Sequence, residues 1–249
     1  INSRLFGLLA YRKSLGNLDD INRIDNPQEN RNLIVGDFRN IGNETRLVHL
    51  YEIKEKPQAF VVGFRLYKGF NNTKQGDANS SNNPDFYFVE DSDFTNWQGL
   101  DESDYSFPSF NTSIFAEHIF NISNKFSVTP GFRYEYISTS SIGTTRIINT
   151  DLSGNLLTDT TLIIEDRNRN RDFIIGGIGF NYKLTNEIEI YSNFSQNYRS
   201  INFSDMQIKN QNFKINPNLQ DERGYNADLG IRGNIKSKLY FDASIYTLF

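Results

Sequence analysis

Residues 224–249 read GYNADLGIRGNIKSKLYFDASIYTLF, and this stretch contains two runs in which apolar and polar side chains alternate. Residues 225–232 carry an apolar side chain at every second position, and the same pattern returns in residues 238–249. Alternation with period two is typical of a β-strand whose two faces meet different surroundings. The connection between the two runs, residues 234–238, is short and polar, so the stretch predicts a β-hairpin.

The same hairpin unit recurs three times upstream. The predicted strand pairs are residues 39–53 and 59–70 around the connection 54–58, residues 107–122 and 126–138 around 123–125, and residues 171–184 and 187–199 around 185–186. Residues 1–12 add a further strand, which makes about nine strands by this alternation pattern.

Long polar stretches separate these hairpins. They cover residues 13–38, 71–106, 139–170 and 200–222, and they are rich in Asn, Asp, Ser and Gly, which favour turns and loops. Short and long connections therefore alternate, as they do between the two ends of an outer-membrane barrel. We expect an all-β fold, an antiparallel transmembrane β-barrel. The alternative, a soluble β-sandwich or lectin-like binding module, predicts loops of similar length at both ends.

The composition is consistent with strands that show lipid on one face only. Hydrophobic residues make up 37% of the chain and aromatic residues 14%, while the mean hydropathy is -0.55. Barrel strands present an apolar side chain only at every second position, and their extracellular loops are polar. The chain has no cysteine and a net charge of -4, which argues against thiol chemistry and against nucleic acid as a partner.

A short Gly-x-Arg pattern predicts which face of the strands is the interior one. It occurs at Gly63-Phe64-Arg65, Gly131-Phe132-Arg133 and Gly230-Ile231-Arg232. Period two places the glycine and the arginine on one face and the apolar residue on the other. Because an arginine facing lipid costs about 2–4 kcal/mol at mid-membrane, we expect Arg65, Arg133 and Arg232 to face the lumen. A chance occurrence of so short a motif is the alternative.

Two segments near the C-terminal end resemble TonB-dependent outer-membrane receptors. Residues 195–205, SQNYRSINFSD, resemble the stretch in which the family leaves a strand for a loop. The residues NPNL at 216–219 and DERGYNADLGIRG at 221–233 resemble the family segment NPxL…E…xELGxRG, with Asp228 in place of the usual Glu.

The first half of the chain resembles the ferric dicitrate-type subgroup of that family. The stretches that carry this resemblance are Phe6-Gly7, RKSLG at 12–16, NIGNETRL at 40–47, residues 63–76, residues 115–117 and residues 130–135. The resemblance implies a barrel of about 22 strands whose lumen is filled by an N-terminal plug. It also implies a TonB box that couples uptake to the inner-membrane proton gradient.

The resemblance, together with both chain ends, predicts that residues 1–249 are an internal piece of such a barrel domain. The first residue is Ile1, no signal peptide is seen, and Phe249 falls inside a strand pattern. We therefore expect the plug and the TonB box to precede this piece and further strands to follow it. The expected location is the outer membrane of a Gram-negative bacterium, with outer-membrane lipid around the barrel.

Arg199 and Asn197 are the candidate ligand contacts nearest the extracellular mouth. Alternation along residues 187–199 turns both toward the lumen, and the order of short and long connections makes this strand run outward. Ferric dicitrate and many siderophore complexes are anionic, so lumen arginines suit them through charge-assisted contacts. Arg65, Arg133 and Arg232 are further candidates. The alternative for Arg199 is an ion pair with a carboxylate of the plug or the wall.

No catalytic, cofactor or metal site is predicted. Residues 77–106 hold eight acids and no Lys or Arg, which could hold calcium but more simply form a solvated loop. Aromatic residues of the same stretch, including Phe86, Tyr87, Phe88 and Trp97, could stack on a ligand or pack together. Asp166, Asn168, Asn170 and Asp172 are spaced like a calcium loop, yet they lack its central Gly and distal Glu, so this segment is also predicted to be loop. His49 and His118 are expected to be structural.

Two transport hypotheses remain at this point. The first is TonB-energised import of a ferric-siderophore or ferric citrate-like complex, with TonB bound through the missing N-terminal region. The second is a TonB-dependent receptor for a glycan or peptide with a lipoprotein partner. Neither hypothesis makes the chain an enzyme.

Overall fold

The computed structural model describes residues 1–249 except 18–23, 25, 90–101, 154–155 and 202–219. The described residues form nine β-strands in one antiparallel sheet, ordered β1 to β9 as they occur in the chain. The strands are β1 (Asn2–Gly16), β2 (Arg31–Ile53), β3 (Lys56–Ala78), β4 (Glu102–Asn121), β5 (Phe126–Thr150), β6 (Leu156–Lys183), β7 (Ile188–Arg199), β8 (Glu222–Ile235) and β9 (Leu239–Leu248). The described part of the chain has no helix long and apolar enough to cross a membrane.

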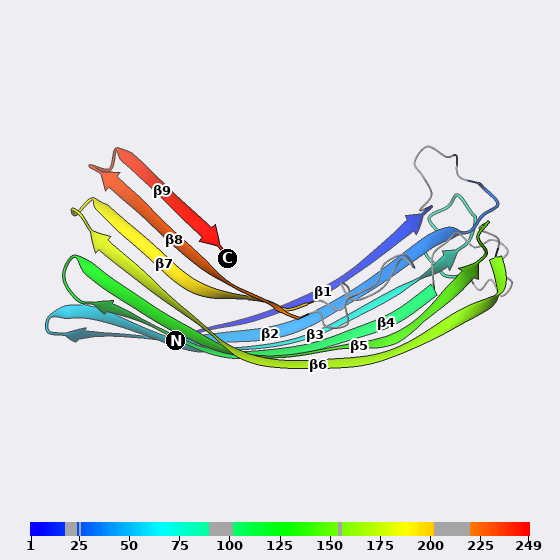
Figure 1. The fold of residues 1–249 in the computed structure, drawn as a ribbon, viewed down its shortest axis with the longest axis horizontal. Coiled ribbons are helices and arrows are strands. Elements are labelled where there is room, and N and C mark those ends of the chain that lie inside the picture. The colour runs from blue at the N-terminus through cyan, green and yellow to red at the C-terminus, as the bar shows by residue number, and fades with distance from the viewer. Residues whose placement is uncertain (18–23, 25, 90–101, 154–155, 202–219) are drawn as a thin grey trace.

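The sheet bends into a trough with a concave and a convex side (Figure 1). The hairpin connections of β2–β3, β4–β5, β6–β7 and β8–β9 lie together at one end of the trough. The trough does not close into a barrel in this chain, because β1 and β9 are the two outer strands of the sheet and do not pair with each other. The fold is therefore a segment of barrel wall, as the alternation of short and long connections predicts.

The four predicted hairpins are confirmed, and two of them turn through left-handed backbone. The φ angles are 49° at Lys54 and 59° at Glu55, and 51° at Lys236 and 56° at Ser237. Two successive residues with positive φ give the turn twist that matches the twist of the flanking strands. The two turns achieve this without glycine.

Three of the four predicted long loops, residues 13–38, 71–106 and 139–170, were predicted too long, whereas β7 ends at Arg199 and β8 begins at Glu222, as the loop 200–222 predicts. Residues 139–150 continue β5 and residues 156–170 belong to β6, so most of the predicted loop 139–170 is paired strand. In the same way β2 begins at Arg31, β3 ends at Ala78, and β4 begins at Glu102. These outer strand halves mix polar and apolar side chains on both faces, as Leu162-Ile163-Ile164 does in β6, so the regular alternation that marks the inner halves is missing there.

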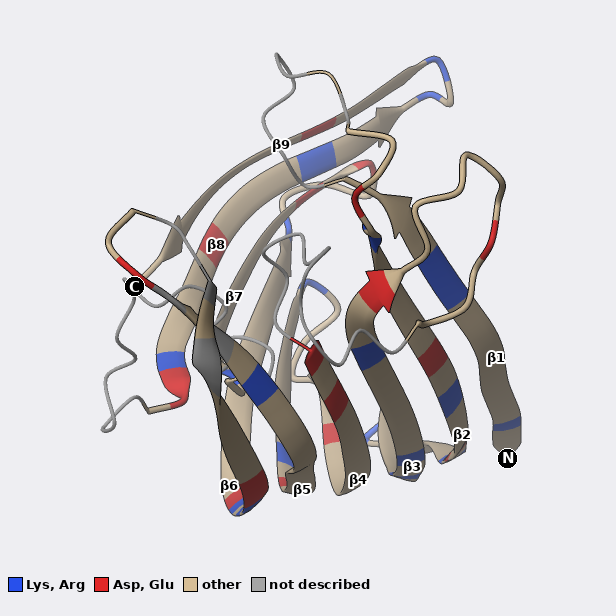
Figure 2. Cartoon of the chain, turned by 90° about the vertical axis from the view of Figure 1, so that its right-hand side faces the viewer, with Lys and Arg blue, Asp and Glu red and all other residues tan. Residues whose placement is uncertain are grey.

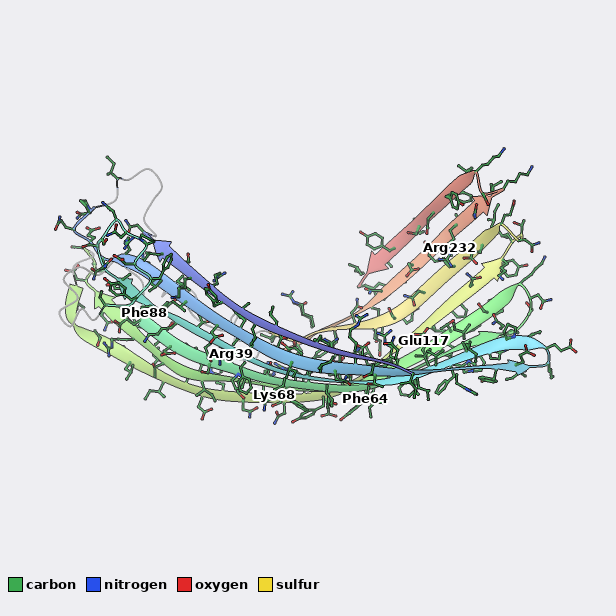
Figure 3. All side chains as sticks on the ribbon, turned by 180° about the vertical axis from the view of Figure 1, so that it is seen from behind. Arg39, Phe64, Lys68, Phe88, Glu117 and Arg232 are labelled. Atoms are coloured by element: carbon green, nitrogen blue, oxygen red, sulfur yellow. The ribbon has the colours of Figure 1, made fainter. Side chains whose placement is uncertain are left out.

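The convex face carries the apolar side chains, as the alternation predicts. Figure 3 shows Phe64 on this side of the sheet and Glu117 on the other. The side chains of the convex face stay open to the surroundings, with Leu9 84% exposed and Ile245 73% exposed. A single sheet has no second layer of protein to cover these residues, so their natural cover is the acyl region of a membrane.

Aromatic side chains mark the two borders of this apolar band. Three strands carry them on the convex face ten positions apart: Phe60 and Phe70 in β3, Phe120 and Phe110 in β4, and Phe126 and Tyr136 in β5. Ten residues at about 3.3 Å each span about 33 Å along the strand. With the usual barrel tilt this becomes about 25 Å across the membrane, which is the height of an outer-membrane barrel's apolar band. His118 lies in the border near the hairpins, where it stacks on Phe120 and hydrogen bonds to Tyr51.

The left-handed turn at Lys54 and Glu55 provides a first test of the fold. We expect Glu55→Gly to raise the free energy of unfolding of the complete protein by about 1 kcal/mol, since glycine adopts positive φ without the steric cost that other residues carry. Reversible urea unfolding in lipid vesicles measures the change. Asn124→Gly is the matched control in a hairpin without positive φ, and an equal gain there would contradict the explanation.

A second test compares two adjacent residues of β9 that face opposite sides. We expect Ile245→Arg, on the convex face, to destabilise the folded protein by about 2–4 kcal/mol because it places a charge in lipid. Ser244→Arg, on the concave face, should cost far less, and the same unfolding measurement compares the two variants. Equal costs would show that the convex side does not face acyl chains.

Candidate functional site

The concave face of the trough collects most of the arginines of the strands. The register pairs Arg65 with Glu44 and with Ser113, and it pairs Phe115 with Arg133, so these side chains share one face. The same register carries this face onward to Asn197, Arg199 and Arg232 in β7 and β8. Arg65, Arg133 and Arg232 therefore lie on the concave side, as the Gly-x-Arg pattern predicts, and alternation along β7 places Asn197 and Arg199 on the same side. Figure 2 shows how the charged residues are distributed along the strands.

Most concave arginines are ion-paired to a carboxylate on the same face. The pairs along one strand are Arg46–Glu44, Arg133–Glu135 and Arg167–Glu165, and the pairs across strands are Arg232–Glu189 and Arg199–Glu222. In a strand, residues two apart lie on one face, so an Arg-x-Glu or Glu-x-Arg sequence supplies a partner locally. The face is thus highly charged but largely neutralised.

Phe115 lies between two of these arginines at mid-height of the wall. The guanidinium carbons of Arg46 and Arg133 lie 5.7 Å and 5.9 Å from the centre of its ring. Both distances fit cation–π contacts. The ring and the two ion pairs hold both guanidinium groups close to the wall, so this part of the lumen presents fixed, paired charges.

Arg65 differs from Arg133 in its partners. Its guanidinium carbon lies 5.5 Å from the centre of the Phe6 ring, but no carboxylate of the described residues lies within ion-pair distance. Glu44 stands opposite Arg65 in the register and is paired with Arg46 instead. The Nε atom of Arg65 is buried and has no hydrogen-bond partner among the described residues. Arg65 is therefore a lumen cation that remains available to an anionic group.

Arg199 ends β7 at the side of the trough away from the hairpins. Its Nη1 lies 3.6 Å from Oε2 of Glu222, and both side chains are 70% exposed. Asn197 and Asn226 hydrogen bond to each other through their side-chain amides. An ion pair between two exposed groups is weak, about 0–1 kcal/mol, so an incoming anion can compete for Arg199.

Arg232 lies near the hairpin end instead. It is three positions before the end of β8, it is paired with Glu189, and its guanidinium carbon lies 5.2 Å from the Tyr191 ring centre. The structure thus spreads the candidate arginines over the height of the wall. It does not bring Arg199, Arg65 and Arg232 together into one site.

The most buried charged cluster of the described residues is centred on Asp221, and it was not predicted from the sequence. Nε of Arg171 lies 2.9 Å from Oδ2 of Asp221, and Nη2 of Arg169 lies 3.7 Å from the same oxygen. The hydroxyl of Tyr198 and the backbone N–H of Ile201 donate hydrogen bonds to Asp221. We call these five residues, Arg169, Arg171, Tyr198, Ile201 and Asp221, the Asp221 cluster.

The Asp221 cluster fastens the ends of the β7–β8 connection to the sheet. Arg171 donates hydrogen bonds to Thr139 on β5 and to the backbone carbonyl of Ile201, and its side chain is only 6% exposed. Ser200 and Ile201 line a hollow of about 350 Å³ with Phe38, Thr73 and Ser109 of the concave face. The chain therefore leaves β7 toward the lumen side of the sheet.

One signal in the sequence points to this cluster. Arg167, Arg169 and Arg171 occur at every second position, with polar residues between them. This is the alternation of a strand with an arginine face, but it contains no apolar residue, so the apolar pattern predicts a loop there. The prediction that residues 166–172 form a loop was wrong, since all of them belong to β6.

Burial and the polar contacts of Asp221 act in opposite directions on the pKa of its carboxyl group, which lies outside the strands. Burial raises the pKa of its carboxyl group, but the hydrogen bonds from Tyr198 and Ile201 and the charges of Arg171 and Arg169 lower it. The hydrogen bonds and the two positive charges together outweigh burial, so the pKa of Asp221 lies below its ordinary value. Asp221 is thus ionised wherever the two arginines are present to hold it.

A shallow hollow of about 800 Å³ lies on the concave face beside Arg133 and Glu117. Its floor contains Gly131, Gly177 and Gly179, where an added Cβ would lie no closer than 3.1 Å to any neighbour. Glycines in a strand often mark a place where another chain or a ligand approaches the backbone. Among the described residues, His, Cys, Asp and Glu form no group that could hold a metal ion. Of the predicted acidic stretch 77–106, residues 90–101 lie outside the described residues, and Trp97 is one of them.

Comparison with known proteins gives one family and several similar folds. The model of the family described as "TonB dependent receptor-like, beta-barrel" matches residues 5–248. The closed form of the ferric-catecholate import receptor Fiu from E. coli K12 has a TM-score of 0.65 at 10% identity, covering 99% of this chain and 38% of that chain. The unliganded ferric citrate transporter FecA has a TM-score of 0.61 at 12% identity, covering 99% and 31%. The copper transporter OprC has a TM-score of 0.59 at 15% identity, covering 88% and 31%. No curated protein matches the chain.

The depressed pKa of Asp221 leads to a pH-dependent prediction. A carboxyl whose pKa is lower in the folded than in the unfolded protein adds stability above its unfolded pKa, about 3.9, and loses it as the pH falls through the folded value. We expect Asp221→Asn to lower the unfolding free energy of the complete protein by about 1–3 kcal/mol at pH above about 5. The difference from the wild type should shrink as the pH falls below about 4.

Tyr198→Phe is the matched control for this measurement. It removes one hydrogen bond to Asp221 but keeps the carboxylate and both arginines, so much of the pH dependence should persist. A difference between wild type and Asp221→Asn that is independent of pH would contradict the assigned role of the charge.

Proposed function

We propose that this chain, which belongs to the TonB-dependent receptor-like β-barrel family, forms part of the wall of a receptor that imports an anionic ferric complex with energy delivered by TonB. Proteins of this family are outer-membrane proteins of Gram-negative bacteria, and that is the location of this wall segment. The family consists of transporters and receptors. The observation that carries the proposal is the arginine-lined concave face opposite an apolar convex face.

The chain spans about a third of each solved structure that it resembles, 38% of Fiu and 31% of FecA. A wall of nine strands with unpaired outer edges needs neighbours, because free strand edges in a membrane leave backbone groups without hydrogen bonds. We infer that other strands of the same receptor pair with β1 and β9. We also infer that a plug occupies the concave side and that TonB binds ahead of that plug.

The orientation follows from the connections. Outer-membrane barrels have short turns at the periplasmic end and long loops outside, so the four hairpins face the periplasm. Arg199 and Asn197 then lie toward the extracellular mouth, Arg65 and Arg133 lie at mid-height, and Arg232 lies near the periplasm. In this arrangement Arg199 is the first of these arginines to meet a ligand, and Arg65 is an available cation further along the path.

An anionic cargo fits this wall better than a neutral one. Guanidinium groups bind carboxylates through two parallel hydrogen bonds, and ferric complexes of citrate or catecholates carry negative charge. Two of the similar solved structures are named as a ferric-catecholate import receptor and a ferric citrate transporter. We propose a ferric-siderophore or ferric citrate-like complex as the cargo.

The test is uptake of radioactive iron by cells that express the complete receptor, supplied as ferric citrate or as a ferric catecholate. We expect uptake that is lost in cells lacking TonB. We expect Arg199→Gln to weaken ferric-complex binding about tenfold, since a hydrogen bond to a charged group contributes about 1.5–3 kcal/mol. Titration of the purified receptor with the same complex measures the affinity.

Glu222→Gln is the matched variant of opposite sign. It removes the competing carboxylate from Arg199, so binding of the ferric complex should be retained or strengthened. Weaker binding in Glu222→Gln and unchanged binding in Arg199→Gln would together reject Arg199 as a ligand contact. Two results would favour a glycan receptor instead. Iron uptake would not depend on the receptor, and a polysaccharide would induce expression of the receptor under iron-replete conditions.

A further inference from the structure

Two cations stand on the convex face at the outer border of the apolar band. Arg39 of β2 and Lys68 of β3 occupy convex positions of the register, at the level where Phe70 and Phe110 mark the border. Figure 3 shows Lys68 on the same side of the sheet as Phe64. A charge on this face is costly at mid-membrane and becomes tolerable only near the headgroups. These side chains therefore lie where lipid headgroups meet the wall.

An apolar groove leads away from these two cations into the membrane band. It has a volume of about 680 Å³ and is lined on the convex side by Leu5, Leu9, Ile41 and Phe70 together with Arg39 and Lys68. Leu5 and Leu9 are 73% and 84% exposed, and Ile41 is 58% exposed. The groove is wide and aliphatic below the cations, which suits acyl chains beneath an anionic headgroup.

The two cations differ in how far they are neutralised. Arg39 is ion-paired with Asp37, and 64% of its side chain is exposed. The ammonium of Lys68 lies 5.2 Å from the Phe70 ring centre, and no carboxylate of the described residues lies within ion-pair distance of it. Arg39 and Lys68 together thus outweigh the single charge of Asp37, and a net positive charge faces the membrane here.

Further cations continue the patch outward on the same strands. Lys13 and Lys74 pair with Val35 from its two sides, so they flank β2 on the convex face beyond Arg39. Lys74 lies 3.9 Å from Asp104, while Lys13 is exposed. The corresponding convex positions of β6 are Asn170 and Asp172, which carry no positive charge. On β5 the convex Arg146 is ion-paired with Glu102, so the cations without a carboxylate partner in this part of the convex face are Lys13 and Lys68 on β1 and β3, among the described residues.

We propose that Arg39, Lys68 and the groove beside them bind a phosphorylated, multiply acylated glycolipid of the outer leaflet, the lipid A part of lipopolysaccharide. The ammonium and the guanidinium hold a lipid A phosphate, and acyl chains lie along Leu5, Leu9 and Ile41. Lys13 and Lys74 face anionic groups further out on the same molecule. This inference rests on the proposed function for the orientation that puts the hairpins in the periplasm.

The test uses the complete receptor purified from outer membranes, stripped of bound lipid in detergent and titrated with bis-phosphorylated lipid A. Native mass spectrometry counts the bound lipid. We expect Lys68→Gln and Arg39→Gln each to weaken binding about fivefold, and the double variant about 25-fold, which is the loss expected for surface cations that face anionic lipid. Lys68→Arg should restore binding, because it keeps the charge at the same place.

Arg65→Gln with Arg133→Gln is the matched double variant on the concave face, and it should leave lipid A binding unchanged. For dephosphorylated lipid A, we expect the wild type and the convex double variant to have the same affinity. Equal binding of phosphorylated lipid A to the wild type and the convex double variant would overturn the proposal. Tighter binding of phosphatidylglycerol than of lipid A would overturn it as well.

Iron uptake by the same variants separates this proposal from the proposed function. The convex double variant should import ferric complexes like the wild type once its folded amount in the membrane is matched. If lipid A binding depends on Arg39 and Lys68 while no ferric complex is imported, only the proposed cargo fails. If ferric import is normal while lipid A binding ignores both cations, only the lipid site fails.

Discussion

The structure depends on one constraint, which is that a single layer of strands must meet two different surroundings with the two faces of the same backbone. Side chains alternate between the faces with period two, so a strand can present lipid-compatible groups on one side and arginines on the other without any further layer of protein. The exposed convex leucines and the paired concave arginines are two results of this constraint. The exposed convex leucines would be unfavourable if the sheet were placed in water alone, whereas the concave arginines would not.

Ion pairing on the concave face follows from the same alternation. A carboxylate two positions from an arginine lies on its own face, as Glu135 does beside Arg133, and the register supplies others across strands, as Glu189 does for Arg232. The strand thus carries its own counter-charges, which lowers the cost of lining the lumen with guanidinium groups. Arg65 shows what happens when the facing carboxylate is engaged elsewhere, because it keeps a positive charge that the wall does not neutralise.

Sequence reasoning predicted the parts of the fold in which the two surroundings differ most. The inner strand halves alternate between apolar and polar residues, so the four hairpins and the face of Arg65, Arg133 and Arg232 could be predicted. The outer halves mix polar and apolar side chains on both faces, and there the alternation no longer separates strand from loop. The Asp221 cluster was missed for this reason and for a second one, since the contact between Arg171 and Asp221 joins residues that only the folded chain brings together.

The distribution of free and paired cations separates the two faces by role. On the concave face a cation that is to meet a passing anion must be released from its partner, which makes the exposed pair of Arg199 and Glu222 a better exchange point than the buried pair of Arg171 and Asp221. On the convex face no carboxylate of the described residues pairs with Lys68, which lies level with Phe110 at the border of the apolar band. Lys68 therefore suits a lipid that remains bound to the barrel wall, whereas the weakly paired Arg199 suits a transported complex that binds and then dissociates.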